Sequence, residues 1–153
     1  METGRFEVRH VHAADRDAWL SLRSQLWPEG SEAEHAEEIS DYFEGRVQAP
    51  LVVMLAFDTS GEPVGLSELS IRWCAEGCRT DRVAYLEGWY VRPEVRRQGV
   101  GKALVAAAEE WARSQGCSEL ASDTEVANAQ STSAHLAVGF EDVGLIRCFR
   151  RAL

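Results

Sequence analysis

The stretch from Val91 to Leu104, VRPEVRRQGVGKAL, decides the fold of this chain. It places two adjacent arginines, a glycine-x-glycine pair and a lysine after an apolar run and before an amphipathic one. Glycine lets a backbone approach an anion closely, and the first N–H groups of a helix point at such an anion. The stretch therefore predicts a strand, a glycine turn and a helix that together hold a phosphate group.

Two common phosphate motifs do not fit this stretch. A Walker A loop needs Ser or Thr after its lysine, but Lys102 is followed by alanine. The dinucleotide fingerprint needs a third glycine at the position of Leu104. What remains is Arg96-x-x-Gly99-x-Gly101, whose glycines and positive charge suit a pyrophosphate.

Length and composition predict one folded domain over residues 1–153, because a chain of this size buries a sizeable core without disulfides or metal. Its residues are 45% hydrophobic and 27% charged, as in folded proteins. No apolar run reaches membrane-spanning length and METGRFEVRH lacks the apolar centre of a secretory signal, so we expect a cytoplasmic location. The four cysteines include no C-x-x-C pair, so we expect no metal site.

The charge of the chain excludes one class of partner. It carries 16 basic and 25 acidic residues, and the net charge of −9 argues against nucleic acid and favours a cationic partner. Acidic residues gather between Glu29 and Glu44, with no lysine or arginine among them. We expect most of them on a solvated helix face and one or two against a ligand.

The first part of the chain predicts a strand followed by two helices. Apolar alternation from Phe6 predicts the strand, and apolar residues at helical spacing predict a helix that Pro28 ends. Ser31 and Glu34 have the spacing of a capping box, so they predict the start of a second helix, which ends near Gly45.

The rest of the chain mixes strands with helices. Two apolar runs joined by turn residues, 51–57 and 64–73, predict an antiparallel hairpin, and residues 83–91 predict a central strand. The further predicted elements are a helix over 99–116, a short strand over 118–122, a helix over 128–138 and extended segments over 140–152. The sequence therefore predicts an α/β (α+β) fold with a mostly antiparallel mixed sheet flanked by helices.

The run from Val91 to Gly101 resembles the acetyl-CoA signature of the GNAT superfamily of N-acetyltransferases, and the order of predicted elements matches that family along nearly the whole chain. The resemblance implies the GNAT fold, in which the strand before the loop splays from its neighbour. The pantetheine arm of acetyl-CoA then enters the gap and the pyrophosphate rests on the loop. By this resemblance the residues that bind acetyl-CoA are Trp89, Tyr90, Val91, Arg96, Arg97, Gln98, Gly99, Val100, Gly101, Lys102 and Asn128.

A second run, from Asn128 to His135 and on to Gly139 and Phe140, resembles the later family segment that ends in Gly-Phe. Many members carry a tyrosine four residues before that glycine, as a proton donor to the CoA thiolate. This sequence has His135 there. Either histidine takes that catalytic role, or water supplies the proton and His135 packs on its helix.

Three shorter runs resemble the aminoglycoside 6′-N-acetyltransferases within that superfamily: LRSQLWP at 22–28, LEGWYV at 86–91 and ELASD at 119–123. The resemblance implies transfer of the acetyl group of acetyl-CoA to the 6′ amine of an aminoglycoside antibiotic, giving antibiotic resistance. It places Glu87 and Asp123 beside that amine. Which of Glu87, Asp123 and His135 is base, orienter or acid stays open.

The residue types suit a polycationic amine on sugar rings, which carboxylates and aromatic faces bind. We therefore expect substrate contacts from Glu87, Asp123, Trp27 and Trp73, although either tryptophan fits core packing equally well. Glu87 lies in an apolar and aromatic run, where a carboxylate needs partners. Strand alternation places it on one face with Tyr85, Trp89 and Val91.

We expect direct attack of the amine on the thioester, because no cysteine has an evident activating neighbour for a covalent route. Two alternatives remain open: an N-acetyltransferase acting on a peptide, polyamine or small metabolite, and a non-catalytic acyl-CoA-binding sensor. We expect neither nucleic acid nor membrane as partner. The apolar segment 145–149 fits either a homodimer interface or an internal strand.

Overall fold

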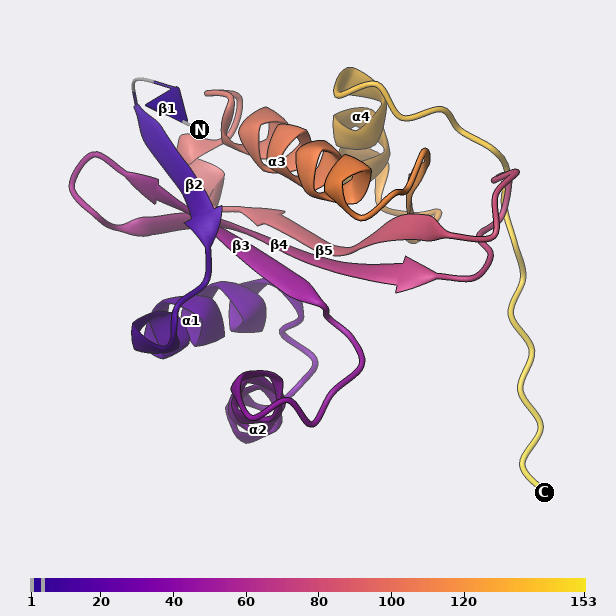
Figure 1. Cartoon of the computed structure of the whole chain (residues 1–153), viewed down its shortest axis with the longest axis horizontal. Helices are drawn as coiled ribbons and strands as arrows, with labels where there is room; N and C mark the ends of the chain where they lie inside the picture. The colour runs from indigo at the N-terminus through magenta and orange to yellow at the C-terminus, as the bar shows by residue number, and fades with distance from the viewer. Residues whose placement is uncertain (1, 4) are drawn as a thin grey trace.

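A computed structural model describes residues 2–3 and 5–153, with side chains from residue 5 onward. The chain contains both strands and helices: two helices follow the first strands, three consecutive strands come next, and a helix, a short strand and a last helix follow them (Figure 1). The strands are β1 (Glu2–Thr3), β2 (Phe6–His10), β3 (Val52–Asp58), β4 (Pro63–Arg72), β5 (Val83–Val91) and β6 (Leu120–Ser122). The helices are α1 (Arg16–Leu26), α2 (Glu32–Phe43), α3 (Val100–Ser114) and α4 (Ala129–Ala137), with short 3₁₀ turns η1 (Ala13–Asp15) and η2 (Pro93–Val95).

The start of α2 follows the capping box expected from the sequence. Ser31 Oγ accepts from the backbone N–H of Glu34 at 3.1 Å, and Glu34 Oε2 accepts from the N–H of Ser31 at 3.0 Å. Two of the N–H groups that a helix start leaves unpaired are thereby satisfied. The capping prediction is confirmed.

The strands form one sheet in the order β1-β2-β3-β4-β5-β6. Neighbouring strands from β1 to β5 are antiparallel, whereas β6 runs parallel to β5. The predicted mostly antiparallel mixed sheet is confirmed. Residues 83–91 were expected to form a central strand, and β5 is an interior strand that pairs with β4 on one side and with the short edge strand β6 on the other.

Helices cover both faces of the sheet: α3 and α4 lie on one face, and α1 and α2 on the other (Figure 1). Leu104 of α3 is fully buried in a cluster that includes Leu69 and Leu86 of the sheet. Trp19 and Leu22 of α1 belong to a second cluster on the opposite face. This layered core fixes which face each β5 side chain meets.

A β-bulge interrupts the pairing of β4 and β5. Glu68 lies opposite Gly88 and Leu69 opposite Leu86, so Glu87 has no partner residue in the ladder. An extra residue of this kind re-aims the side chains that follow it. The bulge lies in the middle of the LEGWYV run.

The bulge corrects one prediction. Tyr85 and Glu87 share a face, as expected, but Trp89 and Val91 pack with the α3 cluster on the opposite face. A Cβ on Gly88 would point to the ring of Trp27 at the end of α1. The alternation rule fails here because the extra residue shifts the period.

Strands β5 and β6 separate early. They pair only at Ala84–Leu120, Tyr85–Ala121 and Leu86–Ser122, so the predicted strand over 118–122 is shorter than expected. From Glu87 to Val91, β5 continues with no strand on that side in the described part of the chain. The two strands therefore open a gap, as the family resemblance implied.

The last residues, 140–153, form no helix or strand; Phe140 still packs against the core, and the residues after Val143 extend away from the body (Figure 1). Val143 passes Gly77, where only glycine leaves room for it, and the chain then leaves the molecule. The apolar side chains beyond this point are exposed, Phe149 to 89%. Extended segments were predicted here, but the alternative that 145–149 is an internal strand of this chain is wrong.

Candidate active site

The phosphate loop lies between the end of β5 and the start of α3. Gly99 is the N-cap of α3 and has a φ of 96°, and Arg97 has a φ of 63°, so the backbone turns sharply twice before the helix. Gly101 lies under the ring of Trp89, and a Cβ there would be 3.1 Å from that ring. The loop and the first turn of α3 thus present a close-packed backbone surface.

The basic side chains of this loop have different tasks. Arg96 folds back, and its Nε donates to the carbonyl oxygen of Val91 at 2.8 Å. Arg97 and Lys102 are exposed and available to an anion. Arg96 therefore shapes the loop, while the other two supply charge next to the helix N-terminus.

The backbone of β5 offers a donor to the gap. Arg92 donates its N–H to Val64 of β4 at 2.9 Å. Since successive N–H groups of a strand point to opposite sides, the N–H of Val91 points to the open edge. A backbone N–H at this edge can stabilise a negatively charged oxygen, and between Tyr90 and Val91 the geometry favours Val91.

Two buried donors near the loop are unsatisfied. Trp89 Nε1 and Arg92 Nε have no hydrogen-bond partner among the described residues. Buried donors normally have partners, so this pair is what a site for an anionic and polar group would leave. Asn128 differs, because its side chain caps α4 by accepting from the N–H of Ser131 at 3.0 Å.

On the other face of β5, five polar side chains form a continuous cluster. Arg72 Nε and Nη2 donate to the two oxygens of Glu87 at 3.0 and 2.7 Å, and Ser70 Oγ donates to the same carboxylate. The Arg72 guanidinium stacks on the ring of Tyr85, 3.5 Å from its centroid. The Tyr85 hydroxyl donates to Asp123. The structure therefore links Glu87 to Asp123 through Arg72 and Tyr85.

The protonation of this cluster follows from its contacts. Burial first, and then the hydrogen bond to Asp123, raise the pKa of Tyr85, so its hydroxyl keeps its proton. Asp123 is exposed and Glu87 is half-buried at the bulge. Glu87 is thus held by Arg72 and Ser70, and Asp123 by Tyr85, while both side chains keep some exposed surface.

The two tryptophans expected at the sugar site are placed differently. Trp27 follows α1, and the end of its ring lies against Gly88 in the bulge. Trp73 follows β4 and is 83% exposed. Trp27 therefore lies at the bulge, whereas the side chain of Trp73 is largely exposed to solvent.

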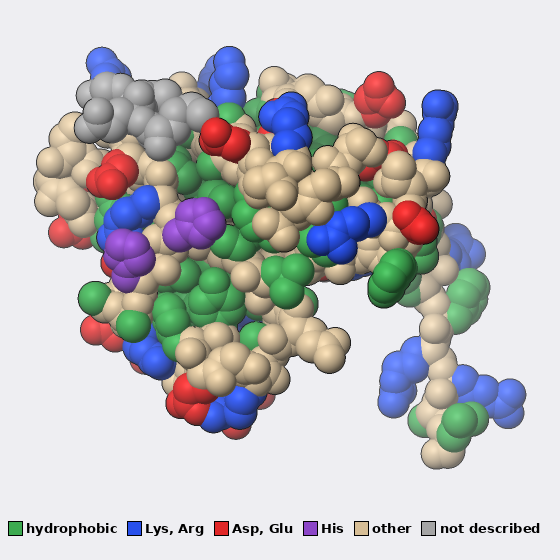
Figure 2. Space-filling view, in the orientation of Figure 1, with side chains coloured by type: hydrophobic (Ala, Val, Ile, Leu, Met, Phe, Trp, Pro, Cys, Tyr) green, Lys and Arg blue, Asp and Glu red, His purple; other side chains and the backbone are tan. Residues whose placement is uncertain are grey.

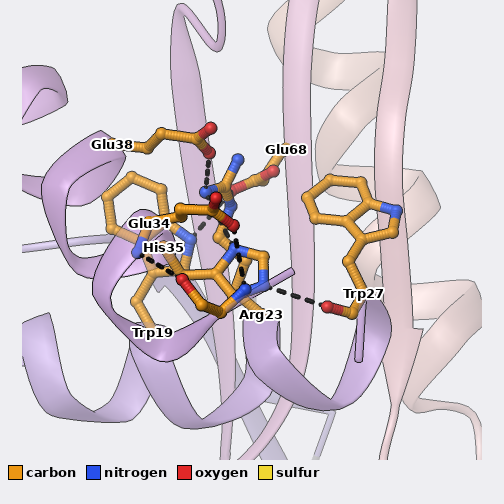
Figure 3. A network of polar contacts seen from close by, with 8 residues as sticks. Trp19, Arg23, Trp27, Glu34, His35, Glu38 and Glu68 are labelled. Carbon is orange, nitrogen blue, oxygen red and sulfur yellow. Dashed lines mark hydrogen bonds and ion pairs between the residues drawn. The ribbon is translucent and has the colours of Figure 1, made fainter. Parts of the chain in front are cut away.

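A buried polar network holds the wall to which Trp27 belongs (Figure 3). Arg23 Nε and Trp19 Nε1 each donate to Glu68 Oε1 at 2.9 Å, and Arg23 also pairs with Glu38 of α2. Burial raises the pKa of Glu68, and the donors Arg23 and Trp19 oppose that rise. The network joins α1, α2 and β4 at the level of the bulge.

His35 extends this network to Trp27. Its Nε2 lies 2.9 Å from the carbonyl oxygen of Trp27 and its Nδ1 lies 3.4 Å from the guanidinium of Arg23 (Figure 3). Nε2 therefore donates and Nδ1 accepts. An open cavity of about 510 Å³ lies here, lined by Arg23, Trp27, Glu29, Gly30, Glu34, His35 and Glu38.

His135 lies on the α3 side of the gap. Its Nε2 is 2.8 Å from Ser122 Oγ and its Nδ1 is 2.7 Å from the carbonyl oxygen of Ser131. The rings of Trp89 and Phe140 meet it edge-on, with centroids 5.1 and 5.2 Å away. His135 is thus near the gap but separated from Glu87 and Asp123 by the sheet.

The sequence did not indicate several of these residues, among them Arg72, Tyr85, Ser70, Ser122 and Arg23. The charged residues Glu68 and Arg72 in a mainly apolar hairpin were the available signals. No group of three or more metal-ligating side chains occurs among the described residues, and in that part of the chain no helix is long and apolar enough to cross a membrane.

Comparison with known proteins identifies this arrangement. The family described as "Acetyltransferase (GNAT) family" matches residues 16–140. The chain belongs to the GNAT acetyltransferase family. This membership agrees with the observed gap between β5 and β6 and with the glycine loop at the start of α3.

Curated relatives within the family carry one name. The chain is 54% identical to an "Aminoglycoside N(6′)-acetyltransferase type 1" from Klebsiella aerogenes over 146 residues, which is 95% of this chain and 96% of that one. It is 40% identical to a protein of the same name from Stenotrophomonas maltophilia, over 95% of this chain and 93% of that one.

Solved structures of family members share the fold. AAC(6′)-Iy in complex with the bisubstrate analog CoA-S-monomethyl-acetylneamine superimposes with a TM-score of 0.88 at 32% identity, covering 97% of this chain and 99% of that one. The aminoglycoside antibiotic 6′-N-acetyltransferase AAC(6′)-Ih from Acinetobacter baumannii gives 0.87 at 32% identity over the same shares. The GNAT fold expected from the sequence is confirmed.

Proposed function

We propose that this chain is an aminoglycoside 6′-N-acetyltransferase that transfers the acetyl group of acetyl-CoA by direct attack of the amine, and that it gives resistance to the antibiotic. One observation carries the proposal: a glycine loop at the start of α3 follows the open end of β5, and two carboxylates, Glu87 at the bulge and Asp123 after β6, lie on one face and are linked through Arg72 and Tyr85. The names of the curated relatives and of the structural neighbours support it.

The donor half of the site consists of the loop and the open edge of β5. The backbone from Arg97 to Gly101 and the exposed Arg97 and Lys102 hold the pyrophosphate, and Trp89 packs beside it. Bound acetyl-CoA supplies a thioester that an amine can attack. The N–H of Val91 stabilises the oxyanion that forms on the thioester carbonyl.

The acceptor half consists of the bulge and the α1–α2 wall. Glu87 and Asp123 each accept from an ammonium group, and Trp27 offers an aromatic face to a sugar ring. The carboxylates of Glu34 and Glu38 at the 510 Å³ cavity suit further ammonium groups of the same substrate. Trp73 takes part only through its exposed ring.

The chemical step needs the amine without its proton. Glu87 accepts this proton, directly or through one water, and Asp123 orients the amine. Arg72 keeps Glu87 in place through two hydrogen bonds. Holding both reactants in one gap makes the attack effectively unimolecular, which supplies much of the rate.

The test is release of CoA thiol by the purified protein with kanamycin, tobramycin, spermidine or a lysine peptide as acceptor. We expect turnover with both aminoglycosides and little with the other two amines. Preferred turnover of spermidine or the peptide would show a GNAT enzyme for another amine. Binding of acetyl-CoA without turnover of any amine would show a non-catalytic sensor. Either result would contradict the proposal.

We also propose that the protein is a homodimer in which each C-terminal segment, residues 143–153, binds the partner. The segment exposes Leu145, Ile146 and Phe149 and carries three arginines and no acid, whereas the whole chain has a net charge of −9. Figure 2 shows it as a string of hydrophobic and basic side chains outside the body. Such a segment stabilises a second copy by pairing with the open edge of its β6.

We place the reaction in the cytoplasm. Cys74, Cys78, Cys117 and Cys148 are free thiols in the structure. Reducing compartments keep cysteines in this form.

A further inference from the structure

The hydroxyl of Ser122 lies at the apex of the gap between β5 and β6. Ser122 and Leu86 form the last pair of the two strands. Ser122 Oγ is 3.2 Å from the carbonyl oxygen of Leu86 and 2.8 Å from His135 Nε2. The hydroxyl therefore stands between His135 and the point where β5 begins its open edge.

The contacts of His135 fix where its protons lie. Nδ1 is 2.7 Å from the carbonyl oxygen of Ser131, which only accepts, so Nδ1 carries a proton. In the neutral ring Nε2 accepts the proton of Ser122. In the imidazolium Nε2 donates to Ser122 Oγ, whose own proton then turns to Leu86 or into the gap. Neither ring nitrogen is left free to reach a leaving group directly.

We propose that Ser122 hands a proton to the departing CoA thiolate and that His135 replaces that proton. The inference rests on the proposed acetyl transfer and adds a residue to it. Both groups lie at the inner end of the gap that receives the thioester in the donor half of the site. Ser122 is the catalytic residue of this pair, and His135 acts through it.

The step balances in atoms and charge. The C–N bond forms and the C–S bond breaks; the sulfur takes the Ser122 proton, and Ser122 takes the Nε2 proton of the imidazolium. The nitrogen of the substrate loses two protons overall, as ammonium becomes amide. Recharging His135 takes up one proton, which replaces the one given to sulfur, so of the two protons that the nitrogen loses one is released to solvent in the net reaction.

The surroundings of His135 favour transfer through Ser122 over transfer from water. Trp89 and Phe140 meet the ring edge-on and cover it. The nearest charged groups in sequence, Asp123 after Ser122 and Glu87 after Leu86, are held by Tyr85 and Arg72 on the other face of the sheet. The aromatic contacts leave the hydroxyl as the polar group next to Nε2.

The kinetic test compares Ser122→Ala, Ser122→Thr and His135→Gln with Ser133→Ala, an exposed serine of α4, as the control. We expect Ser122→Ala and His135→Gln each to lower kcat about 100-fold, near the lower end for general-acid catalysis, with the KM for acetyl-CoA within about twofold. Ser122→Thr keeps the hydroxyl and most of the rate. The double variant loses no more than either single one, because the two residues act in series.

A change of leaving group separates catalysis from packing. With the seleno analogue of acetyl-CoA the departing selenolate needs no proton, so the deficit of Ser122→Ala shrinks to within about threefold of wild type. An equal deficit with the sulfur and selenium donors would overturn the proposal. If the wild-type protein accepts a different amine, the same comparison is run with that amine. The test of Ser122 then does not depend on whether the proposed substrate is correct.

A second readout needs no substrate. In ¹H–¹⁵N correlation spectra of the free protein, we expect the His135 ring to carry its proton on Nδ1 and the Nε2 resonance to shift in Ser122→Ala but not in Ser133→Ala. No shift of the Nε2 resonance in Ser122→Ala would contradict the relay.

Discussion

At the scale of single residues, the acceptor end of the gap rests on two carboxylates that are held in unlike ways. Arg72 and Ser70 hold Glu87 by three hydrogen bonds at the bulge, whereas Asp123 is exposed and receives one from Tyr85. Glu87 is therefore the better fixed of the two. A fixed carboxylate suits proton acceptance, and an exposed one suits binding and orientation.

Replacing these carboxylates by amides separates their roles. We expect Glu87→Gln to lower kcat/KM for an aminoglycoside about 100-fold, mainly through kcat, and Asp123→Asn to lower it about tenfold, mainly through KM. Steady-state kinetics and acetyl-CoA titration measure the effects. Glu62→Gln, in an exposed turn, is the matched control. An unchanged kcat in Glu87→Gln would remove it as the base.

A second residue-scale prediction concerns pH and stability. Arg9 donates two hydrogen bonds to Asp15, and this pair holds the pKa of Asp15 below its usual range. A lowered carboxyl pKa stabilises the fold above the ordinary value of about 4, and this stabilisation is lost as the pH falls through the lower folded value. At pH 7 we expect Asp15→Asn to lower the Tm by about 2–4 °C.

The pH series checks the sign of that effect. The difference in unfolding free energy between wild type and Asp15→Asn stays constant from pH 7 to about 5 and shrinks below about 4. A difference that grows on acidification would contradict this assignment.

At the scale of elements, the network of Arg23 and Glu68 binds two helices to the sheet. Glu68 is 1% exposed, so its charge depends on Arg23 and Trp19 for compensation. Removing one partner of a buried ion pair costs far more than replacing both by apolar groups. The network therefore fixes the position of α1 and α2 against β4.

This contrast gives a prediction on stability. We expect Arg23→Leu to lower the free energy of unfolding by about 3–5 kcal/mol, and Arg23→Leu with Glu68→Leu to recover at least half of that loss. Denaturant titration measures both. Arg113→Leu, which breaks an exposed pair with Glu109, changes it by less than about 0.5 kcal/mol. A double variant as unstable as the single one would contradict the reading.

Elements near a local signal were predictable, and those that depend on pairing were not. The capping box of Ser31 and the glycine turn at Gly99 are encoded within a few residues, and both elements appear as expected. The bulge at Glu87 depends on the register between β4 and β5. The end of β6 depends on the point where it separates from β5. Such features need partners far away in sequence.

The same limit applies to the candidate site. Glu87, Asp123 and the loop were named from short runs of sequence, and their roles stay predictions. Arg72, Tyr85 and Ser122 were missed because strand pairing, and for His135 the packing of α4 on the sheet, bring them to Glu87, Asp123 and His135. No spacing rule along the chain predicts these contacts.

At the scale of the whole molecule, the acidic chain ends in a basic and apolar segment. Helices cover both faces of the sheet, but the large apolar side chains of residues 145–153 stay exposed. Exposed apolar segments of this kind usually meet a partner. That residues 1–153 form a single domain stays a prediction. In the proposed dimer, the C-terminal segment, residues 143–153, binds a second copy of the chain.

Truncation after Asp142 tests the dimer. We expect light scattering to show a dimer for the full chain and a monomer for the truncated one, because in the proposed dimer each C-terminal segment contacts the partner chain. A full-length variant with Leu145→Asp and Phe149→Asp controls for loss of length and gives the same monomer. A monomeric full-length protein, or a dimeric truncated protein, would contradict the proposal that the C-terminal segments hold the dimer together.

The central claim is acetylation at the 6′ amine, and one comparison tests it most directly. Neomycin and paromomycin differ only in carrying an amine or a hydroxyl at the 6′ position. With the purified protein and acetyl-CoA, we predict one acetyl group on neomycin, located at the 6′ nitrogen by mass and NMR analysis, and no amide product from paromomycin. Acetylation of both at a shared amine would show that the gap presents another position of the substrate, and would contradict the account.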